Sequence, residues 1–312
     1  MSESLRPVYL AGTARYLPDQ IMSNVEMFDI PSVRNAFDVE KARGSLRGLE
    51  PGEVAALAPA EVFDRWAQQL TGIVERRILP DTPDARTEDM HVAAGRSALE
   101  HAGIDASEVD LLLAASLTAK EDVPNAACTI ADGIGRPDLP GYVMNAACSG
   151  FLHALASAYA FVASGAADTV LVTVGDALTR ITNWDDPKVA VLFGDGAGAA
   201  VVTSNPSTGR ILGTPVLDGE YSPDHLNVTG LGWGHPLGRE HKLTMAGGAN
   251  VLRNAVRSMQ DVADRALERT SVGWDDVDVV VPHQANERIT QGLEKVLQLK
   301  NGRVLHRIAK IG

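Results

Sequence analysis

GYVMNAACSGFLHALASAYAFVASG, residues 141–165, is the stretch that decides the fold. It predicts a strand over 141–147, a tight corner at Cys148 and a helix from Phe151 to Ser164, which is buried because its residues are small or apolar nearly all the way round. A thiol at a helix N-terminus lies in the positive end of the helix dipole, which favours the nucleophilic thiolate. The stretch therefore predicts a reactive cysteine on a rigid mount.

A structural role for Cys148 is the alternative, because free cysteines are often buried and behave as small hydrophobic residues. The strand–corner–helix pattern favours a reactive residue over this alternative. The second cysteine, Cys128, lies in PNAACTIADGIG without a comparable corner. We expect Cys128 to be a core residue.

Composition limits the classes of protein that fit. The 312 residues are 45% hydrophobic, enough for one large core or two fused ones, and two cysteines are too few for a disulfide framework, which indicates a reducing cytoplasm. MSESLRPVYLAG does not read as a signal peptide, and the apolar segment interrupted by His153, Ser157 and Ser164 is expected to be too short to span a membrane. The net charge of −12 argues against binding to nucleic acid.

Strand patterns alternate with helix patterns along the chain. We expect strands at 7–17, 110–116, 141–147, 168–176, 190–202, 209–219 and 276–284, and helices at 87–103, 148–164, 244–269 and 286–300. This alternation predicts an α/β protein with a sheet buried on both faces.

An internal repeat is also visible. ALEHAGIDASEVDLLL (98–113) aligns without gaps with ALERTSVGWDDVDVVV (266–281), at an offset of 168 residues. Chance similarity is the alternative, since helix–turn–strand units are common. Taken as a duplication, the repeat predicts two similar α/β halves, which we place at 1–205 and 206–312.

Residues 29–66 interrupt the first half. They mix charged residues with glycine and proline and contain two helix-like pieces, one of them in APAEVFDRWAQQL with proline at its first turn. We interpret the segment as a helical insertion on the surface. It is either a lid over a site or a solvated excursion without a role.

His283 lies in DVVVPHQANERI, where a buried strand is expected to end. In open α/β sheets ligands collect at the carboxyl ends of strands, and Cys148 has the same kind of position. In a duplicated fold both residues can face one cleft, where the cysteine attacks and the histidine moves protons or stabilises charge, as covalent acyl chemistry requires. A structural histidine with satisfied hydrogen bonds is the alternative.

Phosphate and metal sites are not indicated. FGDGAG (193–198) is followed by AAVV rather than by a helix, so it predicts a close-packed bend in a strand instead of a phosphate cradle. No spacing of histidine, cysteine and carboxylate residues suggests a metal site. We expect no resident cofactor.

Several motifs together resemble the β-ketoacyl-acyl-carrier-protein synthase III family of thiolase-fold condensing enzymes. The similarity covers nearly the whole chain and rests on GTARYLPDQIMSN, WAQQLTGIVERRI, PNAACTIADGIG, NAACSGF, LFGDGAGAAVV, KLTMAGG and VPHQANERI. It implies a duplicated five-layer α/β/α/β/α fold and a homodimer. It also implies that coenzyme A or phosphopantetheine thioesters are substrates, delivered as acyl-coenzyme A or on an acyl carrier protein.

The resemblance implies roles for individual residues. Cys148 would take the acyl group, with its backbone N–H in an oxyanion hole, and His283 would help to decarboxylate a malonyl-type extender and stabilise the enolate. Trp66 would contact the adenine of coenzyme A. Asn286 and Arg288 would contact the pantetheine arm and the carrier surface.

Departures from the family pattern add further expectations. The family's third catalytic residue, an asparagine in a Gly-Asn-Thr motif, would come directly after Gly312, so we expect the C-terminal half to be incomplete in this sequence. Leu70 and Pro187 stand where typical members place arginines for the coenzyme phosphate or the carrier. Val123 replaces a bulky aromatic residue that closes the acyl pocket from across the dimer, which implies room for a longer or branched acyl group.

Three functions remain open at this point. The first is a condensing enzyme of specialised, polyketide-like or fatty-acid-like metabolism, with ordinary fatty-acid initiation as its variant, because fold similarity does not fix the substrate. The second is an acyltransferase that passes the acyl group from Cys148 to an oxygen, nitrogen or carbon nucleophile without decarboxylation. The third is a non-catalytic partner subunit or fragment. For each we expect no nucleic-acid and no membrane partner.

Overall fold

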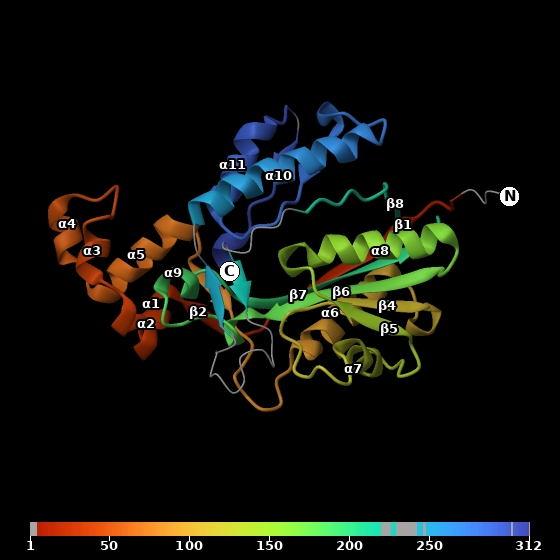
Figure 1. Cartoon of the computed structure of the whole chain (residues 1–312), viewed down its shortest axis with the longest axis horizontal. Coiled ribbons are helices and arrows are strands. Elements are labelled where there is room, and N and C mark those ends of the chain that lie inside the picture. Colours follow the sequence, from red (N-terminus) through yellow and green to blue (C-terminus); the bar gives the residue numbers. More distant parts are fainter. Residues whose placement is uncertain (1–4, 220–225, 229–241, 246–247, 301, 312) are drawn as a thin grey trace.

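A six-stranded mixed sheet forms the centre of the molecule (Figure 1). The computed structural model describes residues 5–219, 226–228, 242–245, 248–300 and 302–311. β4 runs parallel to β5 and β6, whereas β7 runs antiparallel to β6 and β1. The strands, in spatial order, are β5 (Gly141–Met144), β4 (Leu111–Ala115), β6 (Thr169–Ala177), β7 (Asp195–Thr203), β1 (Tyr9–Tyr16) and β8 (Arg210–Ile211).

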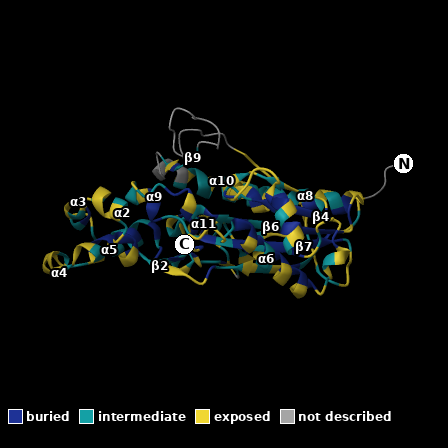
Figure 2. Cartoon of the chain, turned by 90° about the horizontal axis from the view of Figure 1, so that it is seen from below, coloured by how far each residue is buried: buried dark blue, intermediate teal, exposed yellow. Residues whose placement is uncertain are grey.

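Helices cover both faces of this sheet, as its apolar strands predict. α6 (Thr87–Ala102) and α7 (Ala126–Gly133) pack on one face, and α8 (Gly150–Ser164) packs on the other (Figure 1). Two separate hydrophobic cores result, with Leu112 and Leu171 in the first and Leu113 and Val172 in the second. Alternate residues of one strand thus enter opposite cores, and the buried strands form the middle layer of Figure 2.

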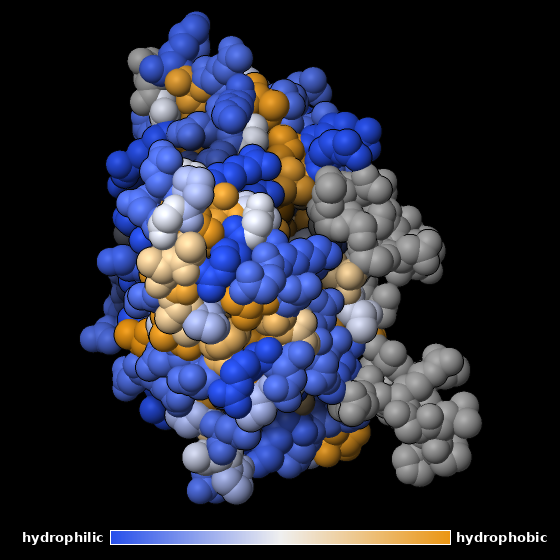
Figure 3. All heavy atoms as spheres, turned by 90° about the vertical axis from the view of Figure 1, so that its left-hand side faces the viewer, coloured by the Kyte–Doolittle hydropathy of each residue, from blue (hydrophilic) through white to orange (hydrophobic). Residues whose placement is uncertain are grey.

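The segment around 29–66 folds into four short helices where the sequence predicted two helical pieces. They are α2 (Pro31–Ala36), α3 (Val39–Arg43), α4 (Pro51–Ala56) and α5 (Pro59–Thr71), which follow β2 (Ile21–Ser23) and α1 (Asn24–Phe28) and precede β3 (Glu75–Arg77). Phe28, Phe37, Phe63 and Trp66 form an aromatic cluster inside this insertion, with ring centroids 4.9 to 6.1 Å apart. Its outer surface is mostly hydrophilic around a central apolar band (Figure 3).

The internal repeat has matching elements in the structure. α6, the 3-10 turn η1 (Ala106–Glu108) and β4 recur as α10 (Gly248–Glu268), η4 (Trp274–Asp276) and β11 (Val279–Val280). β11 pairs in parallel with β12 (Arg303–Val304), as β4 pairs with β5, and α11 (Glu287–Leu297) lies between them in sequence, as α7 does. The division at 205/206 stays a prediction.

Some predicted elements are shorter in the structure. The strand expected at 209–219 is reduced to β8, and the strand expected at 276–284 is reduced to the two residues of β11. The start of the helix expected at 244–269 belongs instead to β10 (Leu243–Met245), which pairs with β9 (Leu226–Val228). The 3-10 turn η5 (Ile308–Lys310) follows β12.

Two burial predictions were wrong. α8 is buried on one face only, because that face alone meets the sheet; Phe151 and Leu152 on its first turn are 39% and 50% exposed. Cys128, expected in the core, is exposed on α7, because its neighbours Ala126 and Ala127 take the buried positions of that turn.

The length estimate for the apolar segment was also wrong. Over Ala147–Ser164, 18 residues with a mean hydropathy of 1.3 are long and apolar enough to cross a membrane. This is weak support for a span, because helices packed in a protein core pass the same test and α8 packs on the sheet.

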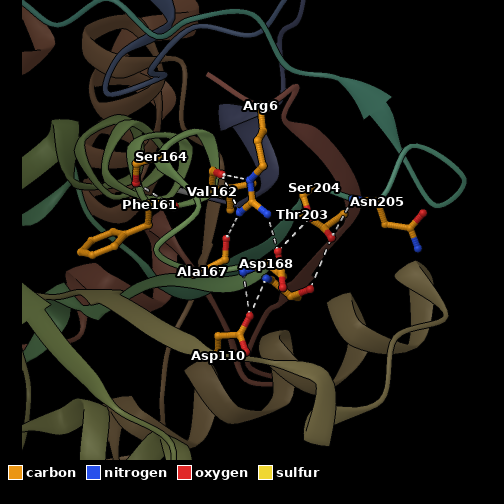
Figure 4. A network of polar contacts seen from close by, with 11 residues as sticks. Arg6, Asp110, Phe161, Val162, Ser164, Ala167, Asp168, Thr203, Ser204 and Asn205 are labelled. Atoms are coloured by element: carbon orange, nitrogen blue, oxygen red, sulfur yellow. Dashed lines mark hydrogen bonds and ion pairs between the residues drawn. The ribbon is translucent and has the colours of Figure 1, made fainter. Parts of the chain in front are cut away.

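The far end of α8 is fixed by Arg6 (Figure 4). Its guanidinium donates from Nη2 to the carbonyl oxygens of Val162 and Ala167, at 2.9 and 2.8 Å, and from Nη1 to Asp168, at 2.7 Å. Asp110 in turn accepts the backbone N–H groups of Asp168 and Thr169. A cation therefore satisfies the last carbonyls of α8 and ties β4 and β6 to the chain before β1.

His91 is a buried titratable residue between α6 and β6. It is 1% exposed, and its ring nitrogens lie 2.9 Å from the carbonyl oxygen of Gly175 and 3.1 Å from the hydroxyl of Thr173. A carbonyl only accepts, so Nε2 carries the proton and Nδ1 accepts from Thr173. Burial lowers the pKa of His91 to about 4, although the bond to Gly175 opposes that shift. The folded protein therefore holds this imidazole neutral.

We expect the free energy of unfolding to fall between pH 6.5 and 4. Because the folded-state pKa of His91 lies below the unfolded value, the unfolded chain binds the proton first, so stability is complete above 6.5 and decreases by about 3 kcal/mol on the way to pH 4. Urea unfolding as a function of pH measures this slope. His91→Gln should flatten the slope and His101→Gln, at an exposed histidine, should not; equal slopes in all three proteins would refute the assignment.

Candidate active site

Cys148 lies on a tight elbow between β5 and α8. β5 ends at Met144, the Oδ1 atom of Asn145 accepts the N–H of Ala147 at 3.3 Å, and Ala147 has a φ of +46°. Few residues other than glycine adopt this left-handed conformation, and it often marks a functional site. Cys148 then lies in the 3-10 turn η2 (Ala147–Ser149), which leads directly into α8.

The thiol is less acidic than the helix N-terminus predicted. Cys148 is open to solvent from a cavity but surrounded by protein on its other sides. Burial raises the pKa of Cys148, the charge of Asp176 raises it further, and only the cysteine's own backbone N–H opposes them. The prediction of a favoured thiolate was wrong because desolvation and a nearby carboxylate outweigh the short turn that precedes α8.

Cys148 and His283 line the same cavity, as the repeat predicted. His283 follows β11 in the second half of the chain, so the two halves contribute one residue each. The cavity has a volume of about 970 Å³ and lies between α8 and the α10–α11 pair. Its walls are largely apolar and include Leu152, Leu155, Val262, Leu267, Val281 and Leu293.

His283 is an uncharged partner for the thiol. The His283 side chain is open to the cavity, but the protein around its other sides lowers its pKa, so its imidazole is neutral at pH 7. The same physical cause, a desolvated cavity wall, keeps Cys148 protonated. The resting pair is therefore a thiol and a neutral imidazole rather than an ion pair.

Asp176 is the acidic residue whose charge raises the pKa of Cys148, and the sequence did not point to it. It lies near the end of β6, where its Oδ1 atom accepts from Leu117 N–H at 2.6 Å and from the hydroxyls of Ser116 and Thr118 at 2.9 and 3.0 Å. Burial raises the pKa of Asp176 by more than these donors lower it, so the net shift is upward. The only signal in the sequence was a carboxylate at the end of an apolar strand, DTVLVTVGD.

Asn286 and Arg288 join α11 to α5. Asn286 caps α11 by accepting the N–H of Arg288 at 2.9 Å, and it donates from Nδ2 to the carbonyl of Leu70 at 3.1 Å. Arg288 donates to the carbonyl of Gln69 at 2.6 Å. Both side chains thus satisfy carbonyls at the end of α5, and their contacts with a pantetheine arm or carrier stay predictions.

The two remaining predicted residues lie elsewhere on the molecule. Trp66 is half-buried in the aromatic cluster, with its ring 5.0 Å from Phe37 and 5.8 Å from Phe63. Val123 is 87% exposed and is not among the residues that line the cavity of Cys148. Within the described ranges no group of three His, Cys, Asp or Glu side chains could hold a metal ion.

A duplicated α/β fold with a cysteine elbow after β5 in one half, and a histidine after β11, the strand of the other half that matches β4, defines the class of thiolase-fold condensing enzymes. A model for 3-oxoacyl-[acyl-carrier-protein] synthase III matches residues 142–217, and one for its C-terminal part matches 267–312. A β-ketoacyl-[acyl-carrier-protein] synthase III of Geobacillus kaustophilus is 34% identical over 303 residues, which are 97% of this chain and 84% of the relative. The chain belongs to the β-ketoacyl-[acyl-carrier-protein] synthase III family.

Solved structures agree with this assignment. The 3-oxoacyl-(acyl carrier protein) synthase III of Pseudomonas aeruginosa PAO1 superposes with a TM-score of 0.78 at 26% identity, covering 98% of this chain and 85% of that one. The priming β-ketosynthase of the R1128 polyketide pathway gives a TM-score of 0.74 at 29% identity, covering 100% and 85%. The predicted thiolase fold is thereby confirmed.

Asn286→Ala should lower the free energy of unfolding by about 1–2 kcal/mol, because it removes an N-cap and the bond to Leu70. Denaturant unfolding of the protein without ligand measures this loss. Gln291→Ala, at an exposed position on the same helix, should change stability by less than about 0.5 kcal/mol. Unchanged stability in Asn286→Ala, together with weaker binding of acyl thioesters, would instead favour a binding role.

Proposed function

We propose that this protein transfers an acyl group from a thioester to Cys148 and joins it to a malonyl-type or β-ketoacyl thioester. The observation that carries the proposal is the shared cavity, which is lined by Cys148 from one half and by His283 from the other. Coenzyme A or a phosphopantetheine carrier would deliver both groups, with no resident cofactor. Membership of the family and the similarity to a polyketide priming β-ketosynthase support a role in fatty-acid-like or polyketide-like biosynthesis. The low cysteine content fits a cytoplasmic setting.

The neutral pair sets the order of proton movements in the acylation step. As the sulfur of Cys148 attacks the thioester carbonyl, His283 accepts the thiol proton, so no thiolate has to exist beforehand. A carbon–sulfur bond to Cys148 forms, the donor's carbon–sulfur bond breaks, and the leaving thiol takes the proton. The backbone N–H of Cys148 would stabilise the oxyanion.

In the second step a malonyl-type thioester loses carbon dioxide and becomes an enolate. A protonated Nε2 of neutral His283 is a hydrogen-bond donor for that enolate oxygen. The enolate carbon then bonds to the acyl carbon, and the sulfur of Cys148 leaves. Carbon dioxide is expected only with a malonyl-type thioester; if product forms from such a thioester without its release, the acyl group has passed to another nucleophile and the enzyme is a plain acyltransferase.

Intact mass spectrometry after exposure to a series of acyl thioesters tests the first step. We expect one acyl mass to be added to the wild type and to Cys128→Ala, and none to Cys148→Ala. The two cysteines make a matched pair, since both are exposed and only Cys148 lies in the cavity. An adduct that persists in Cys148→Ala, or none from any donor, contradicts the proposal and favours the non-catalytic partner.

A homodimer formed along the edge of β5 is part of this proposal. Among the described strands β5 pairs only with β4, so its outer backbone groups form an open edge that can add another strand. Tyr142 on that edge is 39% exposed, and Val123 precedes α7, which packs against β5. A second copy here would cover Val123 and bring it to the partner's site.

Sedimentation should show a mass of about twice 33.1 kDa. Tyr142→Asp on the β5 edge should shift the protein towards monomer, because a charge would be buried without a partner. Ile211→Asp on β8, the opposite edge, is the control and should leave the dimer intact. A monomeric wild type, or equal effects of both variants, would exclude this interface.

A further inference from the structure

The ends of three strands meet beneath the elbow that carries Cys148. Ala115 of β4 is in register with Met144 of β5 on one side and with Val174 of β6 on the other. Ser116 N–H donates to the carbonyl of Met144, at 3.4 Å. The chain leaves β4 at this point, and the residues that follow lead to Val123 and α7.

Asp176 is the main acceptor at this exit, and Thr87 of α6 adds a hydrogen bond from its hydroxyl to the carbonyl of Thr118, at 2.7 Å. Four donors, all from Ser116, Leu117 and Thr118, converge on its Oδ1 atom at 2.6 to 3.1 Å. The hydroxyl of Thr118 also accepts the N–H of Ala177 at 2.8 Å, which ties the turn to β6 a second time. In the described part of the chain the Oδ2 atom accepts no hydrogen bond, so no hydrogen-bonded cation offsets the negative charge of the carboxylate.

We propose that Asp176 is a positioning residue of this active site: its Oδ1 atom fixes the 116–118 turn beside the end of β5 and the segment that leads to Val123. The inference rests on the proposed function in two respects: that Cys148 carries the acyl group, and that Val123 reaches the partner's site in the homodimer. Asp176 itself transfers nothing; it acts through the turn and through the field at the sulfur.

Other charged or titratable groups face the same cavity and are present in any titration of Cys148. His283 comes from the segment after β11 and His153 from α8, where its ring lies 3.0 Å from the carbonyl of Ser149. Asp218, which is paired with Arg265 at 2.9 Å, also lines the cavity, as do Arg257 and Asp261 of α10. Of these groups and Asp176, only Asp176 raises the pKa of Cys148 by its charge.

The molecule contains a matched control. Asp195 begins β7 opposite Ala177, is 3% exposed, and likewise accepts from a backbone N–H, that of Leu79, and from a hydroxyl, that of Thr179. Burial raises its pKa as it does that of Asp176, yet it has no effect on Cys148. Asp195→Asn therefore disturbs a similar carboxylate without changing the charge at the thiol.

The first experiment measures the rate of Cys148 alkylation by iodoacetamide between pH 6 and 10, in a Cys128→Ala background where Cys148 is the only thiol. Asp176→Asn should react roughly three- to tenfold faster near pH 7, with its profile moved to lower pH, because a negative charge is lost. Asp195→Asn should follow the parent. If Asp176→Asn keeps the parent's profile, or both variants shift alike, the proposed charge effect is wrong.

The second experiment separates the turn from the charge by comparing acyl adducts of different chain length. Asparagine keeps an Oδ1 acceptor, so Asp176→Asn should retain the parent's preference among acyl chain lengths. Asp176→Ala should broaden that preference several-fold. If Asp176→Ala does not fold, the pair Ser116→Ala and Thr118→Val removes two donors instead and should broaden it likewise. If the variants that lose these bonds keep the parent's preference for acyl chain length, the positioning role is overturned. If alkylation behaves as expected but the parent forms no acyl adduct, only the proposed function is refuted.

Discussion

Ala147 and Gly150 lie on either side of Cys148, and steric contact at these two positions decides where the thiol can lie. The left-handed φ of Ala147 turns the chain sharply out of β5. A Cβ atom at Gly150 would come within 3.0 Å of the Ala115 Cβ, so a side chain there would force α8 and the end of β4 apart by a few tenths of an ångström. The elbow therefore rests on the sheet itself, and the cavity, the partner histidine and the clamped turn below are all arranged around a fixed point.

One physical cause shapes both reactive groups. Burial disfavours charge, so it raises the pKa of Cys148 and lowers that of His283. A thiolate–imidazolium pair would gain Coulomb energy but would place two charges against apolar walls, with the carboxylate of Asp176 opposing the sulfur's charge. Neutral partners avoid that cost, and the proton then moves only when a substrate carbonyl is present to receive the electrons.

Much of this arrangement could be predicted from the sequence, for reasons that also explain the failures. β4 and β6 are continuous apolar runs and α6 alternates buried with exposed residues at helical spacing, so their patterns determine them. β8 and β11 were expected to be longer because an apolar run indicates an extended chain but not how many residues find a partner strand. The shared cavity of Cys148 and His283 followed from the repeat. Asp176 did not, since its donors lie 58 to 60 residues away and a terminal carboxylate looks like a solvated turn.

The joint between α5 and α11 links the insertion to the second half in a way that no local pattern shows. Gly72 ends α5 with a φ of +81°, and a Cβ atom there would come within 2.4 Å of the Glu287 Cβ, so the two helix ends are in direct contact. Asn286 and Arg288 donate hydrogen bonds across the same contact, to the carbonyl oxygens of Leu70 and Gln69. Trp66 lies on the same helix and packs on Phe37 of the insertion. A displacement of the insertion at α5 must therefore strain the start of α11, whose preceding loop carries His283, so the surface that a carrier would approach and the reacting histidine belong to one connected unit.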